Sequence, residues 1–324
     1  MLNVIANRIR LLLRSELDLN KDRLLGELRK EFVQAHSPEA AVQSLGWHYE
    51  GDAPMEHLVG FGIRFDPVRH AHWLASIQWV ALLVRDCGAT LHLMQTGDIE
   101  IRIGAARLAP ETPIEMAFLM EIFYDECYGV ESKTPFFVWD IGANVGFAAV
   151  YFAALKGWDV AAYELCPPTA ESAQRNIALS GMESKIRLVA EGIGGKNENL
   201  SIDFSPVSRG SNSLFGNSSW EEKGAVQKLD VVVRDASEVI DEVVNSAAGR
   251  PLLVKMDCEG AEYAALQRLL ETDKLHHISV LILEAHIEPG FEPEQAVQTL
   301  LKGGFTVRRK KRLTDRATII YATR

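Results

Sequence analysis

The second half of the chain alternates short apolar runs with segments of helical pattern, which predicts a parallel sheet covered by helices. Phe136 to Trp139 is a compact apolar run and predicts a buried strand. The Ala-rich segment from Phe147 to Leu155 predicts a helix that ends at Gly157, and Asp159 to Tyr163 predicts a second strand. Further strands are predicted at 186–190, 226–233, 252–256 and 279–283, and further helices at 113–128, 169–179, 236–245 and 293–302. This order of elements indicates an α/β fold.

The first 110 residues follow a different pattern and predict an accessory region ahead of a main domain of residues 111–324. A hairpin is expected where Leu91 to Gln95 and Ile99 to Ile103 flank a Thr-Gly-Asp turn. It suits structural cover or part of a substrate lid. Predicted helices cover residues 3–14, 21–33 and, after an Asp66-Pro67 start, 68–86, whereas 36–65 looks irregular. The first helix suits cover for the main domain, or a contact between copies of the chain or with a membrane surface.

Residues 192–225 are rich in Gly, Asn and Ser and predict a loop insertion in the main domain. Only Leu200 to Phe204 has the pattern of a strand there. A polar loop of this length in a compact domain usually serves function. We therefore expect substrate access at this insertion, with Ser211, Asn212 and Ser213 as candidate hydrogen-bonding groups.

The turn after the first of these strands has the chemistry of a site for a nucleoside-bearing ligand. Gly142 and Gly146 remove side chains that would keep the backbone away from a ligand. Glu164 follows the next strand, where a carboxylate can accept both ribose hydroxyls. A structural Gly-rich turn in another α/β fold is the alternative explanation.

The same turn does not match the pattern for a dinucleotide. A dinucleotide loop has Gly-x-Gly-x-x-Gly, and counting from Gly142 this chain has Asn144 and Phe147 at the second and third glycine positions. Asp140 would repel a pyrophosphate but would attract the ammonium and sulfonium groups of S-adenosylmethionine. The turn therefore favours S-adenosylmethionine over a nicotinamide dinucleotide.

Four motifs together resemble the FkbM-type family of S-adenosylmethionine-dependent methyltransferases over about residues 110–324. They are Asp140 to Gly146, Tyr163 to Pro168 with Asn176 beyond it, the Lys-x-Asp-x-Glu-Gly-Ala-Glu element from Lys255 to Glu262, and Leu283 to His286. The resemblance implies a class I methyltransferase with a Rossmann-like, mostly parallel seven-stranded sheet. It also implies methylation of a hydroxyl oxygen on a sugar, a glycoconjugate or a secondary metabolite. The hairpin predicted at 305–309 and 317–322 suits the antiparallel last strand of that sheet.

The predicted strand ends gather acids and a histidine that suit the chemistry of methyl transfer to an alcohol. Ligands of open α/β sheets bind outside the carboxyl ends of the strands. His286 is the first candidate for the base that removes the acceptor's proton, because its ordinary pKa lies near neutrality. Asp257 is the second candidate, as base or as the partner that orients one, and Lys255 lies on the same strand face as Asp257. A structural histidine, and a carboxylate paired to Lys255, are the alternatives.

Four further acids complete the predicted site. Glu191 follows the third strand and is a candidate adenine contact, or else a solvated loop acid. Glu259 and Glu262 are candidates for binding substrate hydroxyls, although Glu262 also suits the first turn of the helix after Gly260. Asp257, Glu284 and His286 together match a divalent-cation set, but ligands spread over two strands form a weaker pattern than a compact motif. The sequence alone does not favour a metal.

Composition narrows the partners and the compartment. The 324 residues carry a net charge of −10, whereas a general nucleic-acid binder shows a basic excess. No apolar run approaches the length of a membrane span, and four scattered cysteines indicate neither a zinc site nor a disulfide framework. We therefore expect a cytoplasmic enzyme with a small-molecule or glycan acceptor. A nicotinamide-dependent oxidoreductase and a non-catalytic adaptor that keeps the fold are the alternatives.

Overall fold

The computed structural model describes residues 48–49, 58–60, 63–66, 68–205, 227–312 and 317–324. The chain forms two compact units, Met1–Ile103 and Gly104–Arg324. The helices predicted at 3–14 and 21–33 and the candidates Ser211, Asn212 and Ser213 lie outside the described residues.

The described part of the first unit contains short strands, two helices and the predicted hairpin. Its elements are β1 (His48–Tyr49), β2 (Leu58–Gly60), β3 (Ile63–Arg64), α4 (Ala71–Ala75), α5 (Ile77–Cys87), β4 (Thr90–Leu93) and β5 (Ile99–Ile103). The antiparallel pair β4–β5 confirms the hairpin, while β1–β3 show that the irregular region expected at 36–65 was wrong where it is described. The single helix expected at 68–86 is two helices, because the Ser76 N–H bonds the carbonyl of Trp73, three residues back, and tightens the chain into a turn.

A seven-stranded sheet is the framework of the second unit, with order β15–β16–β14–β13–β7–β8–β9. The strands are β7 (Phe137–Ile141), β8 (Asp159–Tyr163), β9 (Ile186–Val189), β13 (Leu252–Met256), β14 (Ile278–His286), β15 (Thr306–Arg312) and β16 (Ala317–Thr323). Neighbours pair in parallel except at β16, which runs antiparallel to both β14 and β15. The predicted α/β fold with an antiparallel last strand is confirmed.

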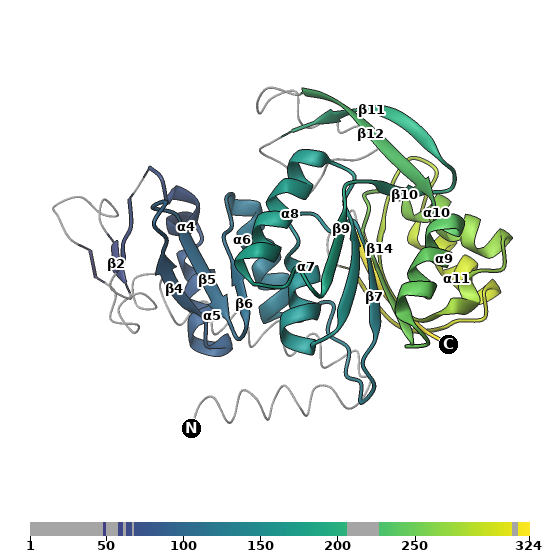
Figure 1. Ribbon diagram of the computed structural model, residues 1–324, viewed down its shortest axis with the longest axis horizontal. Helices are drawn as coiled ribbons and strands as arrows, with labels where there is room; N and C mark the ends of the chain where they lie inside the picture. Colours follow the sequence, from purple (N-terminus) through teal and green to yellow (C-terminus); the bar gives the residue numbers. More distant parts are fainter. Residues whose placement is uncertain (1–47, 50–57, 61–62, 67, 206–226, 313–316) are drawn as a thin grey trace. The chain divides into compact units, whose positions relative to one another are not determined.

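Helices cover both faces of this sheet, which explains why its central strands are apolar throughout. In Figure 1, α7 (Phe147–Val150) and α8 (Pro167–Leu179) lie on one side, and α9 (Ala236–Ala247), α10 (Glu262–Glu271) and α11 (Pro293–Lys302) lie on the other. Every residue of β7 and β13 is buried. A continuous core joins these strands to α9, α10 and α11.

Several predicted boundaries in this unit differ from the structure. The helix expected at 113–128 is α6 (Pro113–Leu119) extended by a π-helical turn to Tyr124, and the chain leaves the helix at Glu126, whose φ is +49°. β14 continues through Glu284 to His286, because β16 supplies a partner strand along that whole length. Asp140 likewise lies within β7 and not after it.

The insertion after β9 forms a second sheet where it is described. The strand predicted at Leu200 to Phe204 is confirmed, whereas the loop predicted at 192–194 and 198–199 was wrong, because these residues also lie in strands. β10 (Gly192–Gly194) runs parallel to β12 (Gln227–Asp235), and β11 (Glu198–Phe204) runs antiparallel to β12. Its inner face packs on a small apolar cluster that includes Cys166, Ile202 and Phe204. Alternating exposed and buried residues in β11 are the pattern of such a half-covered strand.

Candidate functional site

The turn between β7 and α7 packs closely against the end of β13. Gly142 has a φ of +75°, and a Cβ atom there would stand 1.7 Å from the carbonyl oxygen of Asp257. Gly146 has a φ of +81°, and a Cβ atom there would meet Ala173 of α8 at 3.1 Å. Asn144 between them also has positive φ, a conformation that asparagine tolerates better than most residues. Packing therefore requires both glycines, in addition to the close ligand approach that the sequence suggests.

Glu164 closes this turn from the end of β8. Its Oε2 accepts a hydrogen bond from the Asn144 N–H (2.7 Å), and its Oε1 accepts one from the Cys166 N–H (3.0 Å). Burial raises the pKa of Glu164, and these two N–H groups oppose that rise. Each oxygen of an ionised carboxylate can accept a second hydrogen bond. The side-chain Oδ1 of Asn144 is buried and accepts no hydrogen bond from any residue in the described ranges.

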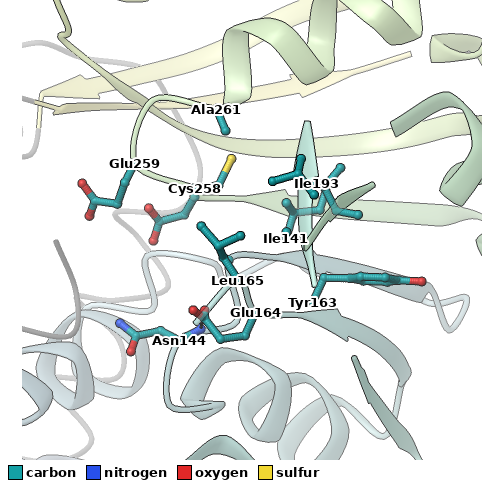
Figure 2. A pocket seen from close by; sticks show the side chains of 13 residues that line it. Ile141, Asn144, Tyr163, Glu164, Leu165, Ile193, Cys258, Glu259 and Ala261 are labelled. Atoms are coloured by element: carbon teal, nitrogen blue, oxygen red, sulfur yellow. Dashed lines mark hydrogen bonds between the residues drawn. The ribbon is translucent and has the colours of Figure 1, made fainter. Parts of the chain in front are cut away.

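A pocket opens beside Glu164, with an empty volume of about 610 Å³ that includes its solvent-facing part. Figure 2 shows Glu164 and Asn144 on one side and Cys258 and Glu259 on the other, with Leu165 between them. The walls are formed by Ile141, Gly142, Asn144, Tyr163, Glu164, Leu165, Gly192, Ile193, Val233, Asp257, Cys258, Glu259 and Ala261.

The pocket brings together only some of the residues predicted from the sequence. Those that line it are Gly142, Asn144, Glu164 and Asp257, together with Glu259. Those that lie outside its lining are Asp140, Gly146, Lys255, Glu191 and His286. The apolar walls from β10 and β12 were not predicted, because residues 192–194 were expected to be loop and the strand predicted at 226–233 was given no role in the site.

Asp140 faces a lysine and not the pocket. It is fully buried, and its Oδ1 lies 3.2 Å from Nζ of Lys255, which stands opposite it in the register of β7 and β13. Lys255 also donates a 2.6 Å hydrogen bond to the carbonyl of Gly142 and lies 3.7 Å from Oδ2 of Asp257. Burial alone would lower the pKa of Lys255, but Asp140 and Asp257 outweigh it and raise the pKa. Lys255 is therefore a buried cation that fixes the turn.

Four acids surround His286 at the end of β14. Its Nδ1 lies 3.0 Å from Oε1 of Glu262, an oxygen that also accepts the backbone N–H of His286 at 2.8 Å. Its Nε2 lies 3.8 Å from Asp257 Oδ1, 3.7 Å from Glu259 Oε2 and 3.7 Å from Glu284 Oε1. Asp257 and Glu259 also line the pocket, so this cluster borders it directly.

These charges change the protonation of the cluster. Burial alone would lower the pKa of His286, but the hydrogen bond to Glu262 and the carboxylates of Asp257 and Glu259 raise it to about 10. Burial raises the pKa of Glu284, and Asp257 raises it further. An imidazolium cannot accept a proton, which weighs against His286 as a simple general base, a role that stays a prediction.

Two residues of the site had other or no predicted roles. Tyr128 is the last residue of the helix predicted at 113–128 and lies beyond the helical segment of the structure, which ends at Tyr124. It donates its hydroxyl to Oδ2 of Asp257 at 3.3 Å, a long-range contact with no local signal. Glu262 is fully buried and orients His286, whereas the sequence suggested a helix terminus or a substrate contact. Glu191 lies 3.3 Å from Nη1 of Arg234, so the structure gives it an ion-pair partner instead of a place in the pocket.

The strand order and the pocket at the carboxyl ends of β7 and β8 define a Rossmann-like methyltransferase of class I. The profile of the methyltransferase FkbM domain matches residues 140–307, just over half of the 324 residues. The chain therefore belongs to the FkbM methyltransferase family and is a methyltransferase. This assignment disfavours the nicotinamide-dependent oxidoreductase considered above.

Individual relatives agree with the family match. Methyltransferase sdnD of Sordaria araneosa is 26% identical over 224 residues, which cover 61% of this chain and 85% of the relative. Among solved structures, the N-terminal domain of human METTL16 in complex with SAH is 13% identical, with a TM-score of 0.39, over 82% of this chain and 87% of that chain. Precorrin-6y C5,15-methyltransferase of Geobacter metallireducens is also 13% identical, with a TM-score of 0.33, over 60% and 82%. These structural similarities are too low to add to the assignment.

Proposed function

We propose that the protein transfers the methyl group of S-adenosylmethionine to a hydroxyl oxygen of a small-molecule or glycan acceptor. The observation that carries the proposal is Glu164, a buried carboxylate held at the pocket by the N–H groups of Asn144 and Cys166. A carboxylate at the end of the second strand of such a unit is placed to accept ribose hydroxyls.

The residues of the pocket fit the donor in three ways. Glu164 keeps an acceptor position on each oxygen for the ribose. Asn144 presents a buried Oδ1 that lacks a hydrogen bond within the described structure and can accept one from a ligand. Ile193 and Val233 add apolar surface that suits an adenine ring. When bound, the donor supplies a methyl group on a positively charged sulfur, and the acidic side chains of the pocket favour that charge over a pyrophosphate.

The cluster beside the pocket suits the acceptor's side of the reaction. A hydroxyl is a weak nucleophile at neutral pH, so its proton must be removed or its oxygen polarised as it attacks. Asp257 borders the pocket and the cluster at once, with Oδ1 turned to His286 and Oδ2 to Tyr128. This position supports Asp257 as the residue that holds the acceptor hydroxyl and receives its proton.

The remaining features support a small acceptor and a reducing compartment. No helix in the described part of the chain is long and apolar enough to span a bilayer. None of the four cysteines forms a disulfide within the described residues, which fits the cytoplasm. The net charge of −10 favours a small hydroxylated or glycosylated acceptor over a nucleic acid.

Calorimetric titration with S-adenosylhomocysteine tests the donor site, and methyl transfer from radiolabelled donor to a panel of sugars and hydroxylated metabolites tests the reaction. We expect Glu164→Gln to weaken binding by at least tenfold, because a neutral amide loses charge-assisted hydrogen bonds. Glu191→Gln is the matched control, because Glu191 lies outside the pocket lining. Equal binding by both variants and the wild type would remove Glu164 from the donor site. Binding without any transfer would favour the adaptor.

A further inference from the structure

His286 is held in one orientation by a buried acid. The side chain of Glu262 has no solvent exposure, and its Oε1 lies 3.0 Å from Nδ1 and 2.8 Å from the backbone nitrogen of His286. Oε2 of Glu262 accepts the N–H of Gly260, so the carboxylate itself cannot rotate freely. A carboxylate at Nδ1 places the ring proton there and turns Nε2 away from Glu262.

Nε2 of His286 points into the acidic cluster without making a hydrogen bond. His286 is only 8% exposed, and the nearest carboxylate oxygens to Nε2 lie at 3.7 and 3.8 Å. An N–H···O hydrogen bond spans about 2.7–3.2 Å, so these three carboxylates face Nε2 at ion-pair distance and none of them hydrogen-bonds it. The largely buried side chain of His286 therefore directs Nε2 at Asp257, Glu259 and Glu284 across a gap in which a shared ligand would fit.

We propose that Asp257, Glu284 and His286 bind a divalent metal cation. One ligand atom from each residue lies within 4.8 Å of the other two. Metal bonds of about 2.0–2.2 Å place neighbouring ligand atoms about 3 Å apart and opposite ligand atoms about 4.2 Å apart. The separations of 3.7 and 3.8 Å from Nε2 fall between these values.

The donor set also indicates which cations fit. Two carboxylates balance the charge of a divalent ion, and an imidazole ligand suits transition-series ions better than Ca²⁺ or Mg²⁺. Mn²⁺ and Zn²⁺ accept both kinds of ligand. The pairing of Glu262 with His286 matches the carboxylate–histidine arrangement that fixes metal-binding imidazoles in proteins.

Outer contacts also prepare Asp257 as a ligand. Tyr128 donates to Oδ2 at 3.3 Å, and Nζ of Lys255 lies 3.7 Å from the same oxygen. Oδ1 remains directed at His286. The positive charge of Lys255 is offset by Asp140 at 3.2 Å, which reduces its repulsion of a second cation.

A cation here would act on the acceptor, and this role rests on the proposed methyl transfer to a hydroxyl. Asp257 lines the pocket, so a cation beside it lies within reach of an acceptor placed there. A hydroxyl bound to a divalent cation loses its proton at lower pH than a free hydroxyl. Asp257 or a solvent molecule would then receive the proton. The oxygen would form a bond to the methyl carbon as the bond from that carbon to the donor sulfur breaks, and S-adenosylhomocysteine would leave.

Titration with Mn²⁺ tests the site directly on the full chain. The protein is treated with a chelator, dialysed, and titrated with Mn²⁺ alone, while electron paramagnetic resonance measures the free aqueous ion. We expect one equivalent to bind, and Zn²⁺ to displace it. Glu284→Gln and His286→Gln should each weaken binding by at least tenfold, and Glu262→Gln, a change to a positioning residue, by about 10- to 100-fold. Glu271→Gln on the exposed end of α10 is the matched control and should bind as the wild type does.

Circular dichroism of each variant separates loss of ligands from loss of fold. Glu284→Gln and His286→Gln are independent probes on β14, so a folding defect in one leaves the other informative. A folded wild type that binds neither Mn²⁺ nor Zn²⁺ at 1 mM would overturn the proposal, as would two ligand variants that bind like Glu271→Gln. Full methyl transfer in the presence of chelator would overturn the cation's role and leave the proposed function standing. Stoichiometric binding without transfer would support the site and count against the function.

Discussion

Replacing Asp140 by asparagine tests which of two roles this acid has. It either stabilises the fold through Lys255 or, as the sequence suggested, contacts S-adenosylmethionine directly. The change keeps the shape of the side chain and removes one partner of a buried ion pair with Lys255. At an effective dielectric constant of about 20, unit charges 3.2 Å apart interact by about 5 kcal/mol. Breaking a buried pair costs about 3–5 kcal/mol, because the remaining charge loses its partner.

The loss of stability in Asp140→Asn should lie at the lower end of this range, because Lys255 keeps other partners. Asp257 stays 3.7 Å from Nζ, and the carbonyl of Gly142 still accepts its hydrogen bond. We therefore expect a loss of about 3 kcal/mol in the free energy of unfolding. For a domain of this size, that corresponds to a fall of about 6–12 °C in Tm.

Thermal unfolding of Asp140→Asn and calorimetric titration of S-adenosylhomocysteine well below its Tm measure the two effects separately. Binding should stay within about threefold of the wild type, because Asp140 is outside the pocket lining. Lys255→Met removes the other partner, and the double variant should lose less stability than the two single losses added together. An unchanged Tm with lost binding would refute this reasoning and restore Asp140 as a donor contact.

Two further substitutions test the turn and the insertion. Gly142→Ala should prevent the wild-type fold of the site, because its Cβ would stand 1.7 Å from the backbone oxygen of Asp257, and loss of S-adenosylhomocysteine binding with a lower Tm would show it. Asp235→Ala should cost about 1–3 kcal/mol in urea unfolding at pH 7, because Asp235 caps α9 through the Ser237 N–H and pairs with Arg268 at 2.8 Å. Burial alone would raise the pKa of Asp235, but Ser237 and Arg268 outweigh it and lower the pKa from 3.8. The contribution of Asp235 to the free energy of unfolding is therefore present at neutral pH and lost as the pH falls through the lowered folded-state pKa. The difference in unfolding free energy between variant and wild type should shrink towards pH 3. It would stay constant if Asp235 were not ionised.

Elements with local boundary signals could be predicted from the sequence, and elements that depend on distant partners could not. Asp159–Tyr163, Leu252–Met256 and Pro293–Lys302 were predicted with the bounds that the structure gives. β10 has only three residues, and its partner is Val233 to Asp235 of β12, about 40 positions away. A polar sequence with many glycines gives no local sign of such pairing.

For single side chains of the site too, the sequence could predict the position along a strand but not the partner across strands. The sequence placed Asp257, Glu284 and His286 at strand ends, and the structure brings these three together. The partner of Asp140 depended on the register of β13 against β7, which puts Lys255 opposite it. An acid beside a glycine turn looks like a ligand contact until its cross-strand neighbour is known.

The positions of the charged residues in the Lys255–Glu262 element have a structural reason. Side chains of a strand alternate between its two faces, and a turn then leads into the next helix. Lys255 and Asp257 are two residues apart and share a strand face, so both meet the turn at Gly142. Lys255 neutralises an acid beneath the turn, which leaves the charge of Asp257 available at the pocket.

The second half of the element serves the histidine. The chain turns at Gly260, whose φ is +102°, and Glu262 then begins α10 with its carboxylate directed back to His286 on β14. Glu262 accepts the N–H of Gly260 with the oxygen that the histidine does not use. Inserting or deleting one residue between Asp257 and Glu262 would move one of the two carboxylates away from His286. The strand periodicity sets the direction of Asp257, and the first turn of α10 sets that of Glu262. The element therefore couples an acid that faces the pocket to an acid that orients His286, and that coupling requires both spacings at once.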